Sequence, residues 1–461
     1  MKYVSIKEKA NEWEVSERQV QYYCQQLRIE GAYKQSGVWL VPADATNPSS
    51  NNIKNLRLLS LFSGCGGMDL GFEGHFSIFK KQFNKRIHPN WEIKDLNNNQ
   101  ILLPKTRFST VFANDIKPEA KTAWTEFFST KKSIYCLDSI VDLVKLQKNN
   151  SINVFPENID IVIGGFPCQD FSIAGNRLGF KSKKSHLGIK ATIDEPCVEN
   201  RGNLYIWMRE VISITEPKVF VAENVKGLTN LGDAQKIIEA DFSRISNDGY
   251  FVFPARILHS AKYGVAQNRE RVIFIGLRKN ALKPGLLEKI KDLNNNSELD
   301  PYPLATHSNN NIPGLLPYVN LKDILGDLDE PEHSKDVDQQ RFSKAKFMGK
   351  HCQGQTEINL NSISPTIRAE HHGNIEFRRL SKENGGVNIE ELESGLKERR
   401  LTLRECARIQ SFPDNYQFYR PGKYGVSSTE AYKMIGNALP PLMAFHIASR
   451  LEELWPIYFG E

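Results

Sequence analysis

The chain has 461 residues, enough for two or three domains, and its 40% hydrophobic and 25% charged residues are typical of a globular protein with sizeable cores. It has no apolar run of membrane-spanning length and no signal-peptide pattern, and its seven cysteines are dispersed, without zinc spacing. These features disfavour a membrane protein, a disulfide scaffold and a zinc site, and they favour a cytoplasmic location. The net charge of +6 permits a polyanionic partner.

The first 48 residues form a predicted separate module. Two capping boxes, Ser5–Glu8 and Ser16–Gln19, each precede an apolar helical face. Residues 32–42 predict a hairpin that turns at Ser36–Gly37, and two helices followed by a hairpin are typical of a winged helix-turn-helix. The module holds six basic and six acidic residues, so DNA binding and docking to a protein both remain open. Our hypothesis is that it represses the protein's own promoter.

Two predicted strands in the next segment end at residues suited to a nucleotide-like ligand. The strand over residues 56–61 runs into a glycine-rich turn at 62–71, where the backbone of a small loop can approach a ligand. The strand over 110–113 ends just before Asp115, where a carboxylate is well placed to accept hydrogen bonds from ribose hydroxyls. Alternatively, Asp115 only caps the helix that follows.

Two further buried strands lead to a cysteine and a carboxylate. The strand over 161–163 ends at Gly164 and Gly165, which predict a tight loop that brings Cys168 to the edge of the sheet. Cys168 is then either reactive or an inert buried cysteine. The strand over 219–222 places Glu223 at the same edge, as an acid whose pKa is raised by burial or as a structural cap.

Arg269 and Arg271 alternate along the next predicted strand, within residues 267–276, so both side chains face the same way. They either contact a substrate or act as structural partners of Glu223. Residues 283–400 are rich in proline and asparagine, and residues 339–380 hold seven basic against three acidic residues. This composition predicts a segment of irregular structure with a basic surface. A helix from 402 to 409 and a final helix over 431–454, interrupted at 436–441, complete the chain.

Six motifs, in this order, resemble those of bacterial DNA (cytosine-5) methyltransferases of restriction-modification systems: Phe62-Ser63-Gly64-Cys65-Gly66-Gly67, Pro167-Cys168-Gln169, Glu223-Asn224-Val225, Gln267-Asn268-Arg269-Glu270-Arg271, Arg400-Leu401-Thr402-Leu403-Arg404-Glu405 and Gly436-Asn437. The resemblance runs from about Leu56 to the end of the chain. It implies an α/β fold with an S-adenosylmethionine-dependent, Rossmann-like sheet and a smaller target-recognition domain. The expected divisions are the N-terminal module 1–48, the catalytic domain 55–285, the target-recognition domain 286–424 and a C-terminal helix 425–461 that completes the catalytic domain.

The resemblance also implies a binding site for S-adenosylmethionine as the methyl donor. Phe62 and Ile116 would lie against the adenine, Asp138 would contact its amino group, and Asp115 would bind the ribose. The full set of residues expected around the donor is Phe62, Ser63, Gly64, Cys65, Gly66, Gly67, Asp115, Ile116, Asp138, Ser139, Pro167, Asn437 and Ala438. Family members often carry glutamate in place of Asp115 and an aromatic residue in place of Ile116. No metal is expected.

For the reaction, the resemblance implies that Cys168 adds to carbon 6 of a cytosine flipped out of the duplex. Glu223 would then protonate or hydrogen-bond the ring nitrogen N3, Arg271 would hold the cytosine O2, and Arg269 would position the loop or backbone. The loop after Cys168 carries five basic residues between Arg177 and Lys190, which predicts a lid that closes over phosphates. The insertion at 75–108 has no predicted function.

Contacts to double-stranded DNA are expected from Gln169, Ser172, Arg177, Thr366, Ile367 and Arg368. The enzyme is expected to act as a monomer on DNA and to protect it from a cognate restriction endonuclease. The same scaffold and motifs have two rival interpretations. A tRNA cytosine methyltransferase is disfavoured by the long basic reading segment and the extra front module. A non-enzymatic regulator is disfavoured because Cys168, Glu223, Arg269 and Arg271 are all intact.

Overall fold

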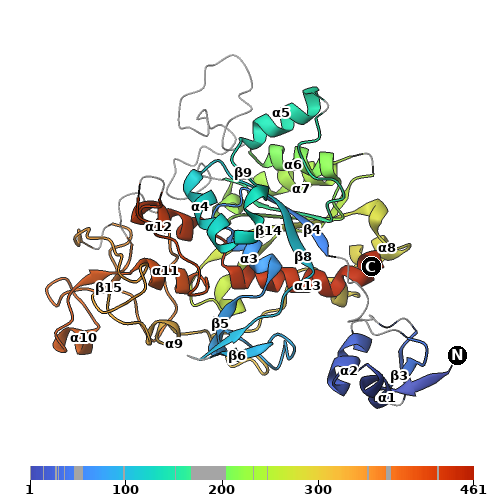
Figure 1. Cartoon of the computed structure of the whole chain (residues 1–461), viewed down its shortest axis with the longest axis horizontal. Helices are drawn as coiled ribbons and strands as arrows, with labels where there is room; N and C mark the ends of the chain where they lie inside the picture. The colour runs from blue at the N-terminus through green and yellow to red at the C-terminus, as the bar shows by residue number, and fades with distance from the viewer. Residues whose placement is uncertain are drawn as a thin grey trace.

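A central mixed sheet of eight strands organises the molecule (Figure 1). The computed structural model describes residues 2–13, 15–25, 29, 31–35, 37–45, 55–96, 99–150, 152–167, 204–231, 233–246, 248–349, 352–369, 375–422 and 425–460. Seven strands run in the order β12-β14-β11-β10-β4-β8-β9, and β13 also pairs with β14. Their bounds are β4 (Leu56–Leu61), β8 (Phe108–Asn114), β9 (Tyr135–Cys136), β10 (Ile161–Gly165), β11 (Val219–Val225), β12 (Tyr250–Val252), β13 (Arg256–His259) and β14 (Glu270–Arg278).

The pairing brings the predicted functional residues to one edge of this sheet. Strand β10 pairs in parallel with both β4 and β11, and β4 pairs in parallel with β8. The carboxyl ends of these strands therefore lie together, where open α/β sheets bind ligands. Strand β14 is antiparallel to β11, so its first residues reach the same edge, with Arg271 opposite Val225.

Helices cover both faces of the sheet. Consecutive residues of β4 point into different cores, with Leu58 in one hydrophobic cluster and Leu59 in the other, as strand alternation requires. One face is covered by α5 (Ile140–Asn150), α6 (Leu204–Thr215) and α7 (Ala234–Ser243), and the other by α3 (Gly67–Glu73), α4 (Pro118–Phe127) and α13 (Pro441–Phe459). Helices α3 and α13 lie very close, because a Cβ at Gly71 would come within 2.4 Å of the Ala444 Cβ.

Residues 286–437 contain mostly short elements, as the proline-rich and asparagine-rich sequence predicts. Buried ion pairs join them. Glu330 bonds to Arg379 and Arg399, and Arg399 also bonds to Glu405. Although burial opposes it, the two arginines hold the pKa of Glu330 down to about 2. The elements are α8 (Leu286–Lys291), α9 (Leu321–Leu325), β15 (Phe377–Arg379), α10 (Ile389–Glu393), β16 (Arg399–Arg400), α11 (Leu403–Ile409) and α12 (Ser428–Asn437).

The insertion at 75–108 forms a small antiparallel sheet in the order β5-β7-β6 (Ser77–Phe79, Gln100–Leu102 and Lys94–Leu96). The Trp91 ring packs edge-on against Phe445 and His446 of α13. Asn84 donates to the carbonyl oxygens of Thr306 and Gly314, each at 2.9 Å. The insertion therefore braces α13 against the segment that follows the catalytic sheet. Short 3₁₀ helices lie at Lys80–Gln82, Ser129–Ile134, Lys226–Asn230, Ser260–Tyr263, Lys279–Ala281 and Ser297–Leu299.

Two buried histidines, His307 and His446, and the half-buried His88 at this brace predict acid sensitivity. Burial lowers the pKa of His88 to about 4 from its ordinary value of 6.5, and it also lowers those of His307 and His446. Imidazoles held neutral in the folded state give stability that is complete above pH 6.5 and is lost as the pH falls toward 4. Urea unfolding followed between pH 7 and 4 is expected to show this loss. In His446→Phe, which keeps the aromatic packing, the loss is expected to be smaller, and an unchanged pH dependence would contradict this assignment.

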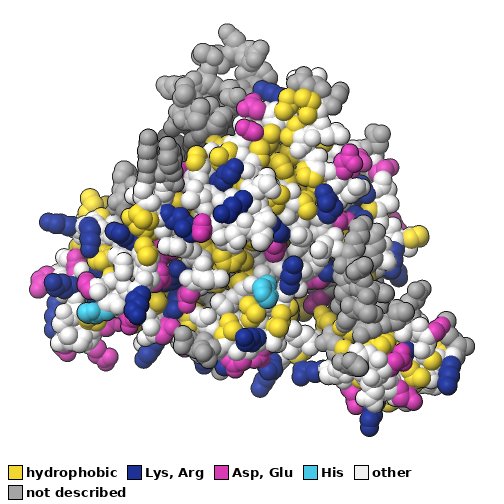
Figure 2. Space-filling model, in the orientation of Figure 1, with side chains coloured by type: hydrophobic (Ala, Val, Ile, Leu, Met, Phe, Trp, Pro, Cys, Tyr) yellow, Lys and Arg dark blue, Asp and Glu magenta, His cyan; other side chains and the backbone are white. Residues whose placement is uncertain are grey.

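The N-terminal unit has its own small core, formed by residues such as Ala10, Val20 and Val41. Its elements are β1 (Tyr3–Ser5), α1 (Ile6–Glu12), α2 (Glu17–Gln25), β2 (Tyr33–Gln35) and β3 (Val38–Pro42), with the sheet order β1-β3-β2. The Lys9 side chain is fully buried and donates to the carbonyl oxygens of Ala43 and Ala45, so it is not a surface cation. Figure 2 shows basic and acidic side chains interspersed on the visible face of this unit.

Several expected elements are present, although α12 begins before residue 431 and α13 ends after residue 454. Ser5 and Thr402 each close a capping box at the start of α1 and α11, and the final helix breaks between α12 and α13. One expectation was wrong. Gly164 and Gly165 belong to β10 itself rather than to a loop, because both are paired with β11, Gly165 opposite Glu223. No helix within the described ranges is long and apolar enough to cross a membrane.

Candidate active site

The glycine-rich turn after β4 is held in an unusual backbone conformation. Gly64 and Gly66 have φ of 53° and 79°, and Phe62, which is not a glycine, has φ of 52°. A Cβ at Gly67 would lie 2.5 Å from the Leu439 carbonyl oxygen, so the turn packs directly against the segment between α12 and α13. A strained aromatic residue at the end of a buried strand is the kind of position that functional sites retain.

Two tyrosines fix the carbonyl groups of this turn. The Tyr135 hydroxyl donates to the Gly64 carbonyl oxygen at 2.9 Å, and the Tyr416 hydroxyl donates to that of Cys65. Cys65 is buried, and burial raises the pKa of its thiol to about 12. The Cys65 thiol is therefore neutral and serves in packing. The part of Cys65 that shapes the turn is its backbone carbonyl group, which Tyr416 holds.

Asp115 connects the turn to the end of β8. Its carboxylate accepts hydrogen bonds from the backbone N–H of Gly64 at 3.1 Å and from that of Lys117 at 3.0 Å. Burial raises its pKa, although these bonds oppose the shift. The N-cap residue of α4 is Lys117, so Asp115 bonds the entrance of the helix without capping it.

The residues beside Asp115 fit an adenosine. Ile116 is 43% exposed, which is unusual for an isoleucine at a strand end, and Phe62 is half-buried. Asp138 is exposed and Ser139 half-buried just beyond β9. Asn114 fixes that segment by donating to the carbonyl oxygens of Cys136 and Asp138. Apolar side chains for a base and carboxylates for a ribose and an amino group thus meet at one edge, so the residues present suit the donor.

Glu223 and Arg271 form an ion pair on the neighbouring strands. The Arg271 Nε lies 2.7 Å from the Glu223 Oε1, and both side chains are nearly buried. Burial raises the pKa of Glu223, and the charges of Arg271 and Arg269 oppose the shift without reversing it. A Cβ at Gly165 would stand 2.7 Å from the Glu223 Oε2. The glycine at the end of β10 therefore leaves room for the carboxyl group in the position that it occupies here.

Arg269 has a different environment from Arg271, although their spacing is that of a strand. It lies just before β14 and is fully buried. Its guanidinium donates to three backbone carbonyl oxygens, those of Ile367 at 3.1 Å, Gly436 at 2.9 Å and Ala438 at 2.8 Å. Arg269 therefore connects the end of the sheet to two segments that are distant in the sequence, while Arg271 faces the carboxyl group.

The remaining predicted site residues fall into three groups. Pro167 is half-buried at the end of β10, where the preceding Phe166 carbonyl oxygen accepts from Asn224 Nδ2 at 3.2 Å. Asn437 is exposed and Ala438 half-buried at the end of α12. The predicted nucleophile, Cys168, lies outside the described residues. So do the predicted lid and three of the predicted DNA contacts, Gln169, Ser172 and Arg177.

The predicted reading residues do not share one environment. Thr366 and Arg368 are half-buried, and the Thr366 hydroxyl donates to the Asn268 carbonyl oxygen. Ile367 is fully buried in the main core. The predicted DNA contact of the Ile367 side chain is therefore corrected to a packing role, because an apolar side chain flanked by two polar ones turns inward here.

Two buried glutamines were missed by the reasoning from sequence. Gln267 and Gln410 are both fully buried and bond to each other, from Nε2 to Oε1 at 2.9 Å. Gln267 belongs to one of the motifs given above. A polar glutamine at the start of an apolar strand could have indicated a buried hydrogen-bonding residue. Gln410 follows the last residue of α11 and carries no comparable signal, since its partners are far away in the sequence.

A model of the C-5 cytosine-specific DNA methylase family matches residues 56–453. The Type II methyltransferase M.BspRI of Lysinibacillus sphaericus is 32% identical over 437 residues, which cover 91% of this chain and 88% of that protein. The chain belongs to this methylase family. The Type II methyltransferase M.BsuRI of Bacillus subtilis is 29% identical over 424 residues, with coverage of 88% and 81%. A mutant DNMT2 of Spodoptera frugiperda has a similar fold, with a TM-score of 0.50, 17% identity and coverage of 87% and 99%.

The methylase is thus a DNA (cytosine-5) methyltransferase that uses S-adenosylmethionine as its methyl donor.

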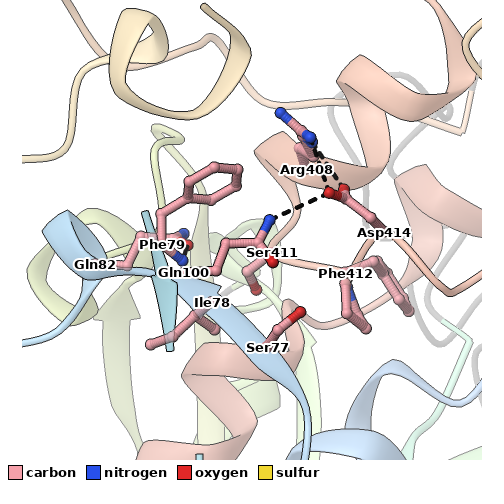
Figure 3. A pocket seen from close by; sticks show the side chains of 10 residues that line it. Ser77, Ile78, Phe79, Gln82, Gln100, Arg408, Ser411, Phe412 and Asp414 are labelled. Atoms are coloured by element: carbon pink, nitrogen blue, oxygen red, sulfur yellow. Dashed lines mark hydrogen bonds and ion pairs between the residues drawn. The ribbon is translucent and has the colours of Figure 1, made fainter. Parts of the chain in front are cut away.

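The pocket drawn in Figure 3 lies between the 75–108 insertion and the end of α11, and a Cβ at Gly67 of the glycine-rich turn would lie 3.2 Å from the ring of its lining residue Phe412. Arg408 and Asp414 bond to each other in its wall, and Gln100 donates to Asp414. Since the charged groups in its wall are paired with one another, we interpret this pocket as a packing gap between two segments of the methylase and not as a second binding site. Its lining residues are Ser77, Ile78, Phe79, Gln82, Gln100, Arg408, Ser411, Phe412, Pro413 and Asp414.

Proposed function

We propose that the methylase modifies cytosine within a specific double-stranded DNA sequence, with Cys168 as the nucleophile and Glu223 as the acid. The observation that carries the assignment is the nearly buried Glu223 carboxyl, which Gly165 leaves room for and Arg271 orients at 2.7 Å. Carbon 5 of cytosine is a poor nucleophile. A thiolate that adds to carbon 6 pushes electron density through the ring to carbon 5, and a proton at N3 stabilises the charge that develops.

The Cys168 sulfur forms a bond to carbon 6, N3 is protonated or hydrogen-bonded by Glu223, and carbon 5 then bonds to a methyl group. When bound, S-adenosylmethionine supplies that methyl group in electrophilic form on a sulfonium. Carbon 5 takes that methyl group as the sulfonium S–C bond breaks, which leaves a neutral thioether. A water molecule then accepts the proton from carbon 5, the bond from carbon 6 to sulfur breaks to release the Cys168 thiolate, and N3 returns its proton to the Glu223 carboxylate, so the aromatic ring is restored. Because a stacked base hides both faces of carbon 6, the cytosine must first be flipped out of the duplex.

The donor is held by residues from three strand ends in this proposal. Phe62 and Ile116 pack on the adenine, Asp115 binds the ribose and Asp138 the amino group, since these are the apolar and acidic side chains at that edge. The backbone of residues 63–67 and of 437–438 encloses the methionine part, with Ser139 and Pro167 at the rim. Arg271 holds the cytosine O2, and Arg269 positions the surrounding backbone.

Residues 286–424 read the target sequence in this proposal, and residues 55–285 and 425–461 perform the chemistry. Thr366 and Arg368 face the DNA on the described part of the reading segment. As the names of its relatives suggest, the enzyme modifies DNA that a cognate restriction endonuclease would otherwise cut, and it acts as a monomer in the bacterial cytoplasm.

Bisulfite sequencing of DNA from a host that expresses the enzyme tests this proposal. The expected result is 5-methylcytosine at one position of one recurring sequence. A parallel assay with purified enzyme compares duplex DNA and tRNA as acceptors of a labelled methyl group. Labelling of tRNA without labelling of DNA would overturn the proposal and favour the alternative substrate.

The N-terminal unit supports a second proposal, namely that it binds DNA and represses the enzyme's own promoter. Helix α2 exposes Arg18 and Gln21, and all three residues of β2 are exposed. Because the unit has its own core, deleting residues 1–45 is expected to raise output from the promoter several-fold while methylation continues. The full-length double variant Arg18→Ala/Gln21→Ala should do the same, as measured with a reporter gene. Unchanged output from both would leave docking to a protein as the role of the unit.

A further inference from the structure

The two buried glutamines connect the reading segment to the donor side of the sheet. The Gln267 Oε1 accepts from the Ile367 backbone N–H at 3.0 Å. On either side, the Asn268 N–H donates to the Ser364 carbonyl oxygen at 2.8 Å, and the Ser364 N–H donates to that of Ala266 at 2.9 Å. Residues 364–367, which belong to the proposed reading domain, are therefore joined to the residues just before β14. Backbone hydrogen bonds and one side-chain amide, that of Gln267, make this connection.

Gln410 makes the other half of the connection. Its Nε2 donates to the carbonyl oxygen of Ile435 at 2.6 Å and to that of Ala438 at 3.3 Å, and its Oε1 accepts from Gln267. Arg269 spans the same gap by donating to Ile367, Gly436 and Ala438. A Cβ at Gly436 would lie 2.2 Å from the Arg368 carbonyl carbon, so the two backbones touch.

This network specifies geometry more than stability. A buried amide–amide hydrogen bond contributes little net free energy of folding, and apolar side chains of similar volume fill such a space as well. Apolar side chains do not fix the register of two neighbouring backbone segments. Hydrogen bonds do, because they define which carbonyl lies opposite which N–H. Here the register that is fixed lies between residues 366–368 and residues 436–438.

We propose that Gln410 is a positioning residue that, through Gln267, holds residues 364–368 of the reading domain in register with the end of α12 at residues 436–438, so that target selection and donor binding depend on one another. The inference rests on the roles proposed above for Thr366 and Asn437. Gln410 itself contacts neither DNA nor donor.

Gln410→Met tests the inference, because methionine keeps the volume and removes every hydrogen bond of the amide. Gln339→Met is the matched control. Gln339 is also a fully buried glutamine, and it donates to the Asp329 carbonyl oxygen at 2.8 Å and accepts from the Thr402 hydroxyl at 2.6 Å. It lies within the reading domain and touches neither connected segment in these contacts. Both variants are expected to lower the melting temperature alike.

Two readouts separate positioning from stability. The first is the calorimetric dissociation constant of S-adenosylhomocysteine, and the second is bisulfite sequencing of unmethylated phage DNA treated with the enzyme. Gln410→Met is expected to weaken binding about tenfold and to raise methylation at sites differing by one base pair about tenfold relative to the main site. Gln339→Met should change neither. If Gln410→Met moves only the melting temperature, or only one of the two readouts, the inference is overturned.

A double-mutant cycle covers the case in which one variant folds poorly. Gln267→Met should reproduce both effects, and Gln267→Met/Gln410→Met should be no worse than either single variant, because the same network is lost. Additive effects would contradict a shared network. Asp138→Ala, which removes an exposed carboxylate proposed to bind the adenine amino group, should affect donor binding alone, and Thr366→Ala should affect site selection alone. If these two fail while the wild type is active, the proposed residue roles are wrong; if they behave as expected and Gln410→Met does not, only the coupling is wrong.

Discussion

Replacing Cys168 by serine is expected to abolish methyl transfer while binding of the donor survives. A serine hydroxyl is almost entirely protonated at neutral pH, whereas a thiol supplies a usable fraction of a strong nucleophile. Loss of the nucleophile should reduce kcat at least about 10⁴-fold, equivalent to about 5.4 kcal/mol of activation free energy. A methylation assay with labelled donor measures the loss, and titration calorimetry with S-adenosylhomocysteine checks that the donor site is intact.

DNA in which 5-fluorocytosine replaces cytosine should trap the wild-type enzyme in a covalent complex. A fluorine at carbon 5 leaves no proton to be removed after methyl transfer, so the bond from Cys168 to carbon 6 persists. Wild-type enzyme should then migrate with DNA on a denaturing gel, whereas Cys168→Ser should not. Cys352→Ser changes a half-buried free cysteine of the reading domain and should still form the covalent complex. Absence of a covalent complex with the wild type would refute nucleophilic catalysis by this cysteine.

Local sequence rules predicted the elements whose stability is local. The capping boxes at Ser5 and Thr402, the strand that begins at Leu56 and the break between α12 and α13 follow from side chains within a few residues of each other. The same rules brought Asp115 and Glu223 to one edge of the sheet, because parallel strands that end in polar residues share that edge.

Contacts between distant segments were beyond these rules. The local pattern predicts a tight loop at Gly165, but this glycine is paired within β10, and its missing side chain makes room for Glu223, which lies opposite it and 58 residues later in the sequence. Strand spacing gave Arg269 and Arg271 the same direction, yet Arg269 precedes the strand and bonds to three distant carbonyl groups. Gln410 has no local pattern at all, since a buried polar side chain is explained only by its partners.

Glu223→Gln is expected to lower kcat by about 10²–10⁴-fold and to remove part of its pH dependence. The amide keeps the size of the carboxyl group but has no proton to transfer to N3. Because burial raises the pKa of Glu223 above its ordinary value of 4.5, the protonated form persists to higher pH than in an exposed carboxyl group. The wild-type rate should therefore fall as the pH rises through this raised pKa, and the rate of Glu223→Gln should lack that fall.

Glu270→Gln is the matched control, on the adjacent strand. Glu270 pairs with Lys226 at 2.7 Å, with side chains 36% and 48% exposed, and an exposed pair of this kind contributes little free energy. Single-turnover rates measured from pH 5 to 9 should be nearly the same for Glu270→Gln and the wild type. If Glu223→Gln keeps both the wild-type rate and its pH profile, then the carboxyl group opposite Gly165 serves only to neutralise Arg271, and the proton at N3 must come from another group.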